Sequence, residues 1–403
     1  MSYVDLNYKP KQDIVCDFYA EPSNRKTCEA IAAESSIGTW TDVATAKPYV
    51  KKLAAKVFSI DKNRIKIAYP IELFEYDNVP QILSSVAGNI FGMKAVNNLR
   101  LEDIHLPEKI VRSYDGPKFG IAGIRKILRV RKRPLVGTIV KPKLGLNTKD
   151  HAKVAYDAWI GGCDIVKDDE NLSNQRFNPF KARVIETLRM RDHAEKETGE
   201  RKVYMPNVTA ETKEMLRRAA FVKKNNGEYV MVDIITCGFS SLQSLRNQDL
   251  NLVIHAHRAM HAAITRNKKH GISMLVIAKL ARLIGVDQLH TGTIVGKLEG
   301  GKEVIDIDNE LKKKWYRIKP TFPVCSGGLS PLHVPQLMKF FGRDIIIQMG
   351  GGIHGHPSGT LAGARAVRQA VDATMSGASL KDYSKKHHEL AAALQKWGVR
   401  SYE

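Results

Sequence analysis

The most regular pattern in the chain is an alternation of short apolar runs with longer amphipathic stretches, beginning near residue 117. Stretches with helical spacing, such as 182–197, 210–224, 273–283 and 361–375, lie between or after many of the apolar runs. Eight parallel strands with intervening helices predict a closed (β/α)8 barrel. The expected strands are 135–140, 164–167, 202–207, 229–235, 251–257, 288–293, 321–326 and 344–349.

The first part of the chain lacks this rhythm. Strand-like stretches at 14–19 and 64–69 are interspersed with helical ones at 24–35 and 79–87, which is typical of an α+β layer. The segment Ser-Tyr-Asp-Gly-Pro at 113–117 has the composition of a linker. We therefore expect a smaller α+β domain at 1–116 and a barrel domain at 117–403.

The composition is that of a soluble enzyme. No apolar run in the 403 residues approaches the length of a membrane span, and residues 1–10 are polar, so we expect a cytoplasmic protein without membrane contact. The five cysteines are scattered and show no paired spacing for zinc or for a disulfide framework. They are interpreted as small buried or strand residues.

The chain is strongly basic, with 63 Lys and Arg against 42 Asp and Glu and a net charge of +21. Nucleic-acid binding is one interpretation of such a balance. However, the basic runs at 125–133, 266–269 and 312–314 are dispersed and aromatic residues do not interleave with them. We therefore favour a solvated basic surface that also attracts anionic substrates, and do not expect a nucleic-acid partner.

Ionisable residues and glycines gather where the predicted barrel strands end. Since the carboxyl ends of the strands in such a barrel surround one pocket, these residues are expected to share a site. The residues at or just past the strand ends are Lys141, Lys143, Lys167, Asp168, Asp169, Glu170, His257, Arg258, His290, Ser326, Gly327, Gly328, Gly350 and Gly351.

The segment 161–171 reads GGCDIVKDDEN and places Lys167 beside three carboxylates. Alternation along the strand sends Lys167 and Asp169 to one side, and Glu170 can turn inward as the strand ends. A desolvated lysine loses its proton readily, and the free amine can add CO2 to give an anionic carbamate. Lys167, Asp169 and Glu170 would then suit Mg2+. Taken alone, the segment could also be a solvated acidic turn with Lys167 as its counterion.

The remaining strand-end residues suit an anionic substrate. Lys141, Lys143, Arg258, His290 and Lys297 supply cationic or donor groups. The runs Ser326-Gly327-Gly328 and Gly350-Gly351-Gly352 leave backbone N–H groups accessible. This layout fits a sugar bisphosphate across the barrel mouth, although each glycine run alone could be a tight turn and each lysine a solvated one.

Several short segments, in the same order, resemble those of the large subunit of ribulose-1,5-bisphosphate carboxylase/oxygenase (RuBisCO). The lysine segment at 161–171 resembles the signature that carries this family's carbamylated lysine. The others are AESSIGTW at 33–40, GNIFG at 88–92, KPKLGL at 141–146, HAHRAMH at 255–261, HTGTIVGKLEG at 290–300, SGG at 326–328 and GGG at 350–352. The expected fold is thus a (β/α)8 barrel preceded by a smaller α+β, ferredoxin-like domain.

The resemblance implies addition of CO2, or of competing O2, to ribulose 1,5-bisphosphate with Mg2+ and a carbamate on Lys167. It assigns proton transfer to Lys141 and His257 and a mobile loop to Lys297, whose partner is Glu34. It further implies that Glu34, Thr39, Trp40 and Asn89 come from a neighbouring subunit, so we expect a homodimer or an assembly of dimers.

One position departs from plant-type members of the family, because Ile139 stands where they have threonine. Thr138 is one residue off and is expected to face the other way. The compact ends resemble archaeal form III enzymes, which implies salvage of nucleotide-derived ribose, as from AMP, and no small subunit. A RuBisCO-like enolase or isomerase of sulfur salvage remains the alternative, and a binding protein without activity ranks last.

Overall fold

The structure is a computed structural model that describes residues 2–39, 41, 43–295 and 301–398. The chain forms two compact units. The first comprises Met1–Gly116, Met260–Ile284 and Lys314–Ile318, and the second comprises Pro117–Ala259, Gly285–Lys313 and Lys319–Glu403. The division into domains 1–116 and 117–403 stays a prediction.

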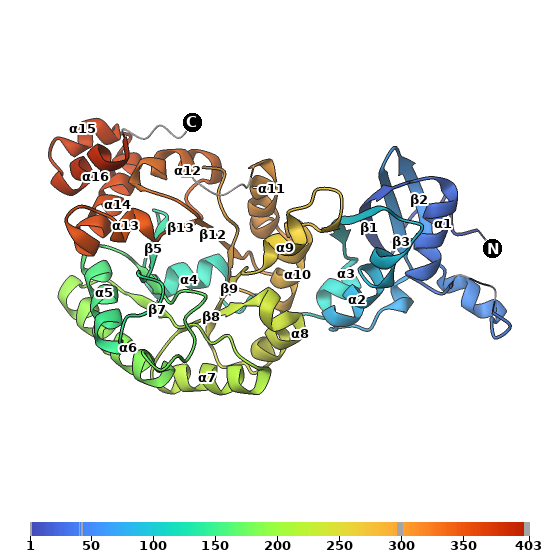
Figure 1. The fold of residues 1–403 in the computed structure, drawn as a ribbon, viewed down its shortest axis with the longest axis horizontal. Helices are drawn as coiled ribbons and strands as arrows, with labels where there is room; N and C mark the ends of the chain where they lie inside the picture. Colours follow the sequence, from blue (N-terminus) through green and yellow to red (C-terminus); the bar gives the residue numbers. More distant parts are fainter. Residues whose placement is uncertain (1, 40, 42, 296–300, 399–403) are drawn as a thin grey trace. The chain divides into compact units, whose positions relative to one another are not determined.

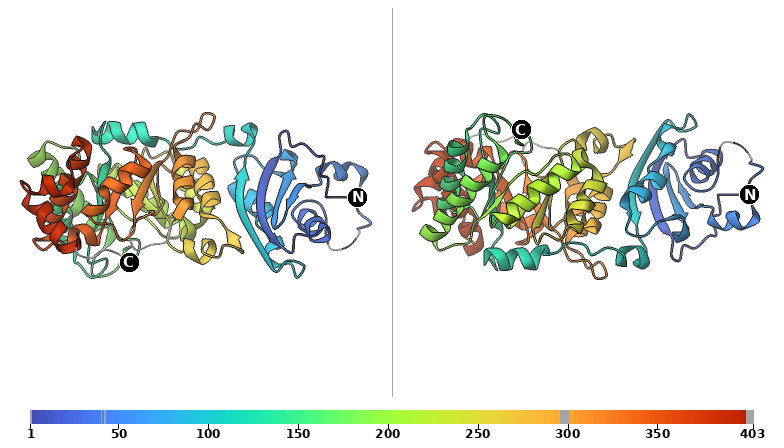
Figure 2. Two further views of the ribbon diagram at one scale, coloured as in Figure 1. Left: turned by 90° about the horizontal axis from the view of Figure 1, so that it is seen from above. Right: turned by 90° about the horizontal axis from the view of Figure 1, so that it is seen from below.

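The first unit is built on a five-stranded sheet in the order β10-β4-β1-β3-β2 (Figure 1). Strand β1 alternates buried and partly buried residues along its whole length, as expected for a strand with one face in the core. Helices α1 and α2 follow β1 and β3, and α1 lies against one face of the sheet in Figure 2. The antiparallel order β4-β1-β3-β2 is that of a ferredoxin-like domain, which confirms the expected α+β fold. The bounds are β1 Ile14–Glu21, α1 Arg25–Glu34, β2 Lys56–Asp61, β3 Arg64–Tyr69, α2 Val79–Val86, β4 Asn98–His105 and α3 Glu108–Arg112.

A late part of the chain completes this unit. The two-residue strand β10 (Gly271–Ile272) pairs in parallel with β4, and helix α10 (Met274–Ile284), buried at every residue except the partly buried Leu275, follows it. Lys279 of α10 reaches Asp103 of β4 at 2.5 Å. Helix α9 (His261–Thr265) belongs to the same unit.

The second unit contains eight parallel strands in the order β7-β6-β5-β13-β12-β11-β9-β8. Two hydrogen bonds connect the end strands of this list, from Val208 N to Met231 O (2.9 Å) and from Met231 N to Pro206 O (2.9 Å), so the barrel is nearly closed. Each strand lies inside its expected range, which confirms the barrel. The strands are β5 Leu135–Ile139, β6 Ile165–Lys167, β7 Val203–Met205, β8 Tyr229–Asp233, β9 Val253–His257, β11 Gln288–His290, β12 Phe322–Ser326 and β13 Ile346–Met349.

Helices surround these strands, as α5, α6 and α7 do along one arc of the barrel in Figure 1. Several of these helices end at a residue in the left-handed (αL) conformation. Gly199 ends α6 and Gly377 ends α14 in this way. The helices of this unit are α4 Gly120–Leu128, α5 Thr148–Ile160, α6 Phe180–Thr198, α7 Thr212–Lys224, α8 Ile234–Asn247, α11 Gly301–Lys312, α12 Val334–Phe341, α13 Gly351–His354, α14 Gly359–Ser376, α15 Leu380–Ser384 and α16 His388–Gly398.

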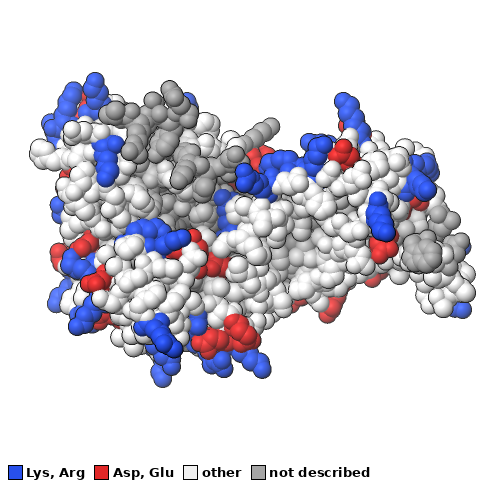
Figure 3. Space-filling model, in the orientation of Figure 1, with Lys and Arg blue, Asp and Glu red and all other residues white. Residues whose placement is uncertain are grey.

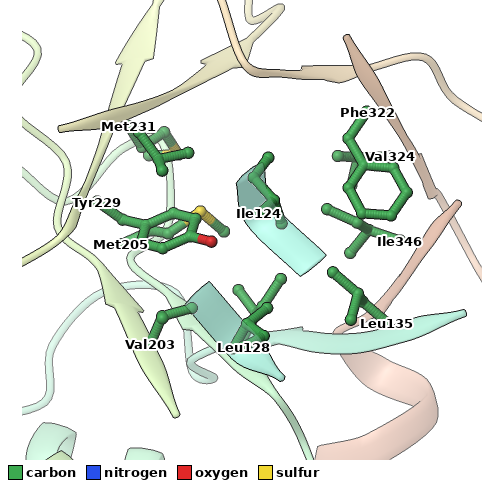
Figure 4. Packing of buried hydrophobic residues seen from close by; sticks show 12 residues of the cluster. Ile124, Leu128, Leu135, Val203, Met205, Tyr229, Met231, Phe322, Val324 and Ile346 are labelled. Carbon is green, nitrogen blue, oxygen red and sulfur yellow. The ribbon is translucent and has the colours of Figure 1, made fainter. Parts of the chain in front are cut away.

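Helix α4 fills the amino-terminal end of the barrel. Its residues Ile124 and Leu128 pack among inward-facing strand residues such as Leu135, Val203 and Phe322 (Figure 4). Asp287 holds the start of this helix by accepting hydrogen bonds from the N–H groups of Phe119 (2.7 Å) and Gly120 (3.0 Å). The apolar cluster closes this end, so that chemistry is confined to the carboxyl ends of the strands.

Three expectations about composition can be compared with the structure. All five cysteines are free thiols, four of them buried and Cys237 partly so. Within the described ranges, no helix is long and apolar enough to cross a membrane. On the face drawn in Figure 3 the basic side chains are scattered, and many have acidic neighbours, which fits a solvated basic surface.

Candidate active site

Lys167 is the last residue of β6 and is 1% exposed. Its Nζ atom donates to the backbone oxygen of Asp168 (2.8 Å) and lies 3.1 Å from the sulfur of Met231 and 3.7 Å from Glu170. Burial lowers the pKa of Lys167, although the carboxylates of Glu170 and Asp169 oppose this shift. The structure thus keeps an amine that loses its proton more readily than a surface lysine.

Asp168 points away from Lys167 into a buried network. Its carboxylate accepts hydrogen bonds from Tyr204 (2.6 Å), from the N–H of Asn207 (2.9 Å) and from Arg183 (3.1 Å), and lies 3.1 Å from His151. Burial alone would raise the pKa of Asp168, but Arg183 and these donors hold it well below its usual range. Asp168 is a charged anchor behind the strand end.

Asp169 and Glu170 lie on the side of Lys167. Asp169 is 1% exposed and pairs with Nζ of Lys141 at 2.6 Å, while its other oxygen accepts from the side chain of Asn171 at 3.0 Å. Burial would raise the pKa of both acids, but Lys141 lowers that of Asp169 and Lys167 that of Glu170, so both fall below their usual ranges. The acids are therefore ionised and available as oxygen ligands.

Within the described ranges no group of three His, Cys, Asp or Glu residues is arranged to hold a metal ion. The site offers two carboxylates, Asp169 and Glu170, beside the buried amine of Lys167. This set fits a divalent ion only if the lysine itself becomes anionic, as a carbamate does. Two carboxylates and a carbamate supply oxygen donors alone, which is the chemistry that Mg2+ prefers.

His257, at the end of β9, lies between two acids. Its Nδ1 is 2.8 Å from Asp233 and its Nε2 is 3.7 Å from Glu170. Because a carboxylate only accepts, the 2.8 Å contact with Asp233 requires a proton on Nδ1, whereas the backbone N–H of Ala259, 3.2 Å away, would need Nδ1 as an acceptor. The shorter contact favours the Nδ1–H tautomer, whose Nε2 has a free lone pair near Glu170. This arrangement suits a group that accepts and returns a proton.

Arg258 and His290 form a second cationic and donor pair. Arg258 Nε donates to His290 Nδ1 at 3.3 Å, and burial lowers the pKa of Arg258 to about 10 and that of His290 well below its usual range. The neutral His290 therefore presents Nε2–H as a donor. Gly292 has a φ of +86°, and a Cβ there would lie 2.2 Å from Arg258, so only glycine leaves room for the guanidinium group.

The two glycine runs follow β12 and β13. A Cβ at Gly350 would lie 3.1 Å from the Lys141 side chain, a Cβ at Gly352 would lie 2.1 Å from the oxygen of Leu329, and a Cβ at Gly351 would meet nothing within 4 Å. Gly350 thus permits the approach of Lys141, and Gly351 faces open space. The other run continues from Ser326, which is 8% exposed, into Gly327 and Gly328, both with positive φ.

The remaining expected residues are described separately. In the first unit, Asn89 donates to Glu34 at 3.3 Å, and Thr39 is exposed. In the barrel unit, Lys143 is exposed. Trp40 and Lys297 lie outside the described residues.

Several residues of the site were not expected from the sequence. Asp233 ends β8, and Asn207 follows β7 and donates to the backbone oxygen of Glu170 at 3.0 Å. These are the two strands to which no candidate was assigned, so extending the strand-end argument to every strand would have found both. Arg183, Tyr204 and Met231 carried no comparable signal, because their partners are distant in the sequence.

The strand ends of this nearly closed barrel bring together a buried lysine, two ionised acids and a histidine between carboxylates. Two glycine runs follow neighbouring strands at the same end. These features are typical of an α/β-barrel enzyme that acts on an anionic substrate. Residues 120–397 match the catalytic domain, and residues 2–110 the N-terminal domain, of the ribulose bisphosphate carboxylase large chain. The chain belongs to this family and is an enzyme of the carboxy-lyase class.

Several archaeal enzymes are similar to the chain over nearly its whole length. The chain is 51% identical to the ribulose bisphosphate carboxylase of Methanocaldococcus jannaschii, over 98% of this chain and 100% of that protein, and 48% identical to that of Pyrococcus abyssi, over 99% and 96%. Among solved structures, an octameric RuBisCO of Pyrococcus horikoshii OT3, in complex with sulfate, superposes with a TM-score of 0.96 at 47% identity, covering 99% and 97% of the two chains. The dimeric enzyme of Hyperthermus butylicus gives 0.93 at 44% identity, covering 99% of each. These relatives support the resemblance to archaeal form III enzymes.

Proposed function

We propose that the protein adds CO2, or O2 in competition, to the enediolate of ribulose 1,5-bisphosphate. After carboxylation, addition of one water molecule and cleavage of the carbon chain release two molecules of 3-phosphoglycerate. The observation that carries the proposal is the buried amine of Lys167, which lies 3.7 Å from Glu170 at a strand end. The names of its relatives support the same reaction. A non-enzymatic role would give no reason to bury such an amine beside two ionised acids.

Activation would begin at Lys167. Because the pKa of Lys167 is lowered, this amine becomes neutral at a lower pH than the amine of a solvent-exposed lysine does. Only the neutral amine can capture CO2. The resulting carbamate, with Asp169 and Glu170, would hold Mg2+. When bound, this ion would supply electrostatic stabilisation of the negative charge that develops on the substrate.

The chain's own groups would move the protons. The Lys167 carbamate would accept the proton removed during enolisation, and Nε2 of His257, oriented through Asp233, would assist proton transfer. Lys141 would donate the final proton at the carbon released last. Its ion pair with Asp169 would have to open first.

The phosphates would bind at the strand ends. Ser326, Gly327 and Gly328 after β12, and Gly350 and Gly351 after β13, would present backbone N–H groups and a hydroxyl. Arg258, His290 and Lys143 would bind negatively charged groups of the substrate, such as a second phosphate, further round the mouth of the barrel. Lys297 is proposed to close over the substrate and exclude water.

We further propose an assembly of dimers in which Glu34, Thr39, Trp40 and Asn89 serve the neighbouring subunit's site. Support comes from the Glu34–Asn89 contact, which places two of these residues together, and from the solved relatives, which are dimeric or octameric. A small subunit is not expected. Salvage of ribose from AMP, in the cytoplasm, is the proposed setting.

Labelled bicarbonate tests the proposal. Incubation with Mg2+ and ribulose 1,5-bisphosphate should place label in 3-phosphoglycerate. Exchange of the substrate's C3 proton without label in the product would instead identify a RuBisCO-like enolase or isomerase, and would contradict the proposed function.

A further inference from the structure

Thr138 has a buried hydroxyl that the proposed chemistry does not use. It lies on β5 and is fully buried, and its Oγ1 is 2.7 Å from the backbone oxygen of Met349 and 2.9 Å from Nε2 of His354. The neighbouring Ile139 takes the inward position, with its Cδ1 3.9 Å from a Cβ built at Gly350. The side chain of Thr138 thus faces away from the substrate pocket, as its place in the strand predicts.

The direction of each hydrogen bond follows from what each atom can do. The oxygen of Met349 can only accept, so the single hydroxyl proton of Thr138 is donated there. His354 must then donate from Nε2 to Thr138, which leaves its Nδ1 to accept from the hydroxyl of Thr360 at 3.0 Å. Burial lowers the pKa of His354 to about 4, so the neutral ring that this chain of bonds requires is the stable form.

This series of hydrogen bonds ends at one peptide group, the one between Met349 and Gly350. The oxygen of Met349 belongs to the same planar trans peptide as the N–H of Gly350, and the two groups point in opposite directions. Since β13 lies between β5 and β12, an oxygen held toward β5 turns the N–H of Gly350 toward the run that begins at Ser326. In the described part of the chain, that N–H has no hydrogen-bond acceptor.

We propose that His354, acting through the hydroxyl of Thr138, is a positioning residue that fixes the Met349–Gly350 peptide with its N–H aimed at a phosphate of the substrate. The inference rests on the proposed function for the identity of the bisphosphate. It adds a link from β5 through α13 to the phosphate site, made by residues that never touch the substrate.

The test compares Thr138→Val, which keeps the side-chain shape and removes the hydroxyl, with Thr138→Ser, which keeps the hydroxyl. Without the hydroxyl, the Gly350 N–H should be less well aligned with the phosphate, at a cost comparable to the net free energy of one hydrogen bond. The KM for ribulose 1,5-bisphosphate should therefore rise about 3- to 10-fold while kcat stays within about twofold. Thr138→Ser should stay within about twofold of wild type in both.

A matched control exists at the other end of the barrel. Thr321 is also fully buried, and its hydroxyl donates to the oxygen of Val286 at 2.8 Å. Thr321→Val should lower the melting temperature about as much as Thr138→Val does, but leave the KM unchanged. Equal KM values for the two valine variants would overturn the proposal.

His354 gives a second route that does not disturb a strand. His354→Leu should reproduce the rise in KM, and His354→Gln, whose amide N–H reaches a similar point, should largely restore it. Because the two residues act in series, the double variant of Thr138→Val with His354→Leu should be no worse than either alone. Additive losses, or no rescue by glutamine, would contradict the proposal.

Binding separates this inference from the proposed reaction. Calorimetric titration of each variant with ribulose 1,5-bisphosphate measures affinity whether or not CO2 is fixed, and the Kd should follow the KM pattern above. If wild type binds the bisphosphate but fixes no CO2, the proposed function fails while the positioning role still stands on the Kd series. If the Kd is the same for Thr138→Val and wild type, the positioning role fails.

Discussion

Asp168 and Glu170 are two residues apart, yet their surroundings are opposite. Asp168 is fully buried and accepts from Tyr204, Arg183 and the Asn207 backbone. The Glu170 side chain is 31% exposed, and the nearest nitrogens of Lys167 and His257 lie 3.7 Å from its carboxylate. A carboxylate with all its lone pairs taken stabilises the fold, whereas one held just beyond hydrogen-bond distance is free to bind something else.

The largest effect expected from this contrast is on activity at Lys167. Lys167→Met should lower CO2 fixation by at least about 10³-fold, because it removes both the proposed base and a metal ligand. Lys202→Met is the matched control, since Lys202 is also fully buried but bonds Cys163 and Glu200 before β7 begins. A fixation assay on both proteins should show loss only in the first, and comparable losses would place Lys167 among structural lysines.

The second prediction concerns stability and separates the two kinds of acid. Asp168→Asn leaves Arg183 buried without its counterion and should lower the free energy of unfolding by about 3–5 kcal/mol. Asp169→Asn should cost about 1 kcal/mol or less, because its partner Lys141 is one-third exposed, yet it should abolish fixation. Urea unfolding measures the difference. An Asp169 variant as unstable as the Asp168 variant would remove the contrast.

A smaller effect should appear when pH is varied. The pKa of Asp168 is lowered in the folded state, so its stabilisation is fully present above the ordinary carboxyl pKa of about 3.9 and is lost as the pH falls through the folded value. The stability difference between wild type and Asp168→Asn should therefore be constant from about pH 5 to 7 and shrink below about pH 4. Denaturant unfolding at pH 6 and at pH 3.5 measures it, and a gap that widens in acid would refute the assignment.

The same contrast shows what the sequence can predict. Alternation places Lys167 and Asp169 on one side and Asp168 on the other, and the strand-end argument gathers His257, His290 and the glycine runs; the hydrogen bonds bear out the separation. The partners of Asp168 could not be predicted, because Arg183 lies on a helix and Tyr204 within another strand, and no local pattern links them. Strand β10 could not be predicted either, because a strand of two residues shows no periodicity in the sequence.

The smallest effect should come from the second contact of Asp169. Asn171 donates to Asp169 through its side chain at 3.0 Å and through its backbone at 3.1 Å, so Asn171→Ala removes only one of the two bonds. Mutation of a residue that orients a metal ligand without touching the ion usually weakens metal affinity about 10- to 100-fold. Because the backbone bond to Asp169 remains, we expect a loss of about tenfold or less for Asn171→Ala. Titration of CO2-activated enzyme with Mg2+, read by fixation rate at saturating substrate, should give an apparent Kd that is measurably weaker than that of wild type, by about tenfold at most. Asn225→Ala, which removes a bond to Phe221 on the outer helix α7, should leave that Kd unchanged. If both variants bind Mg2+ like wild type, Asp169 does not need the Asn171 side chain to orient it, and its contacts with Lys141 and with the Asn171 backbone N–H suffice.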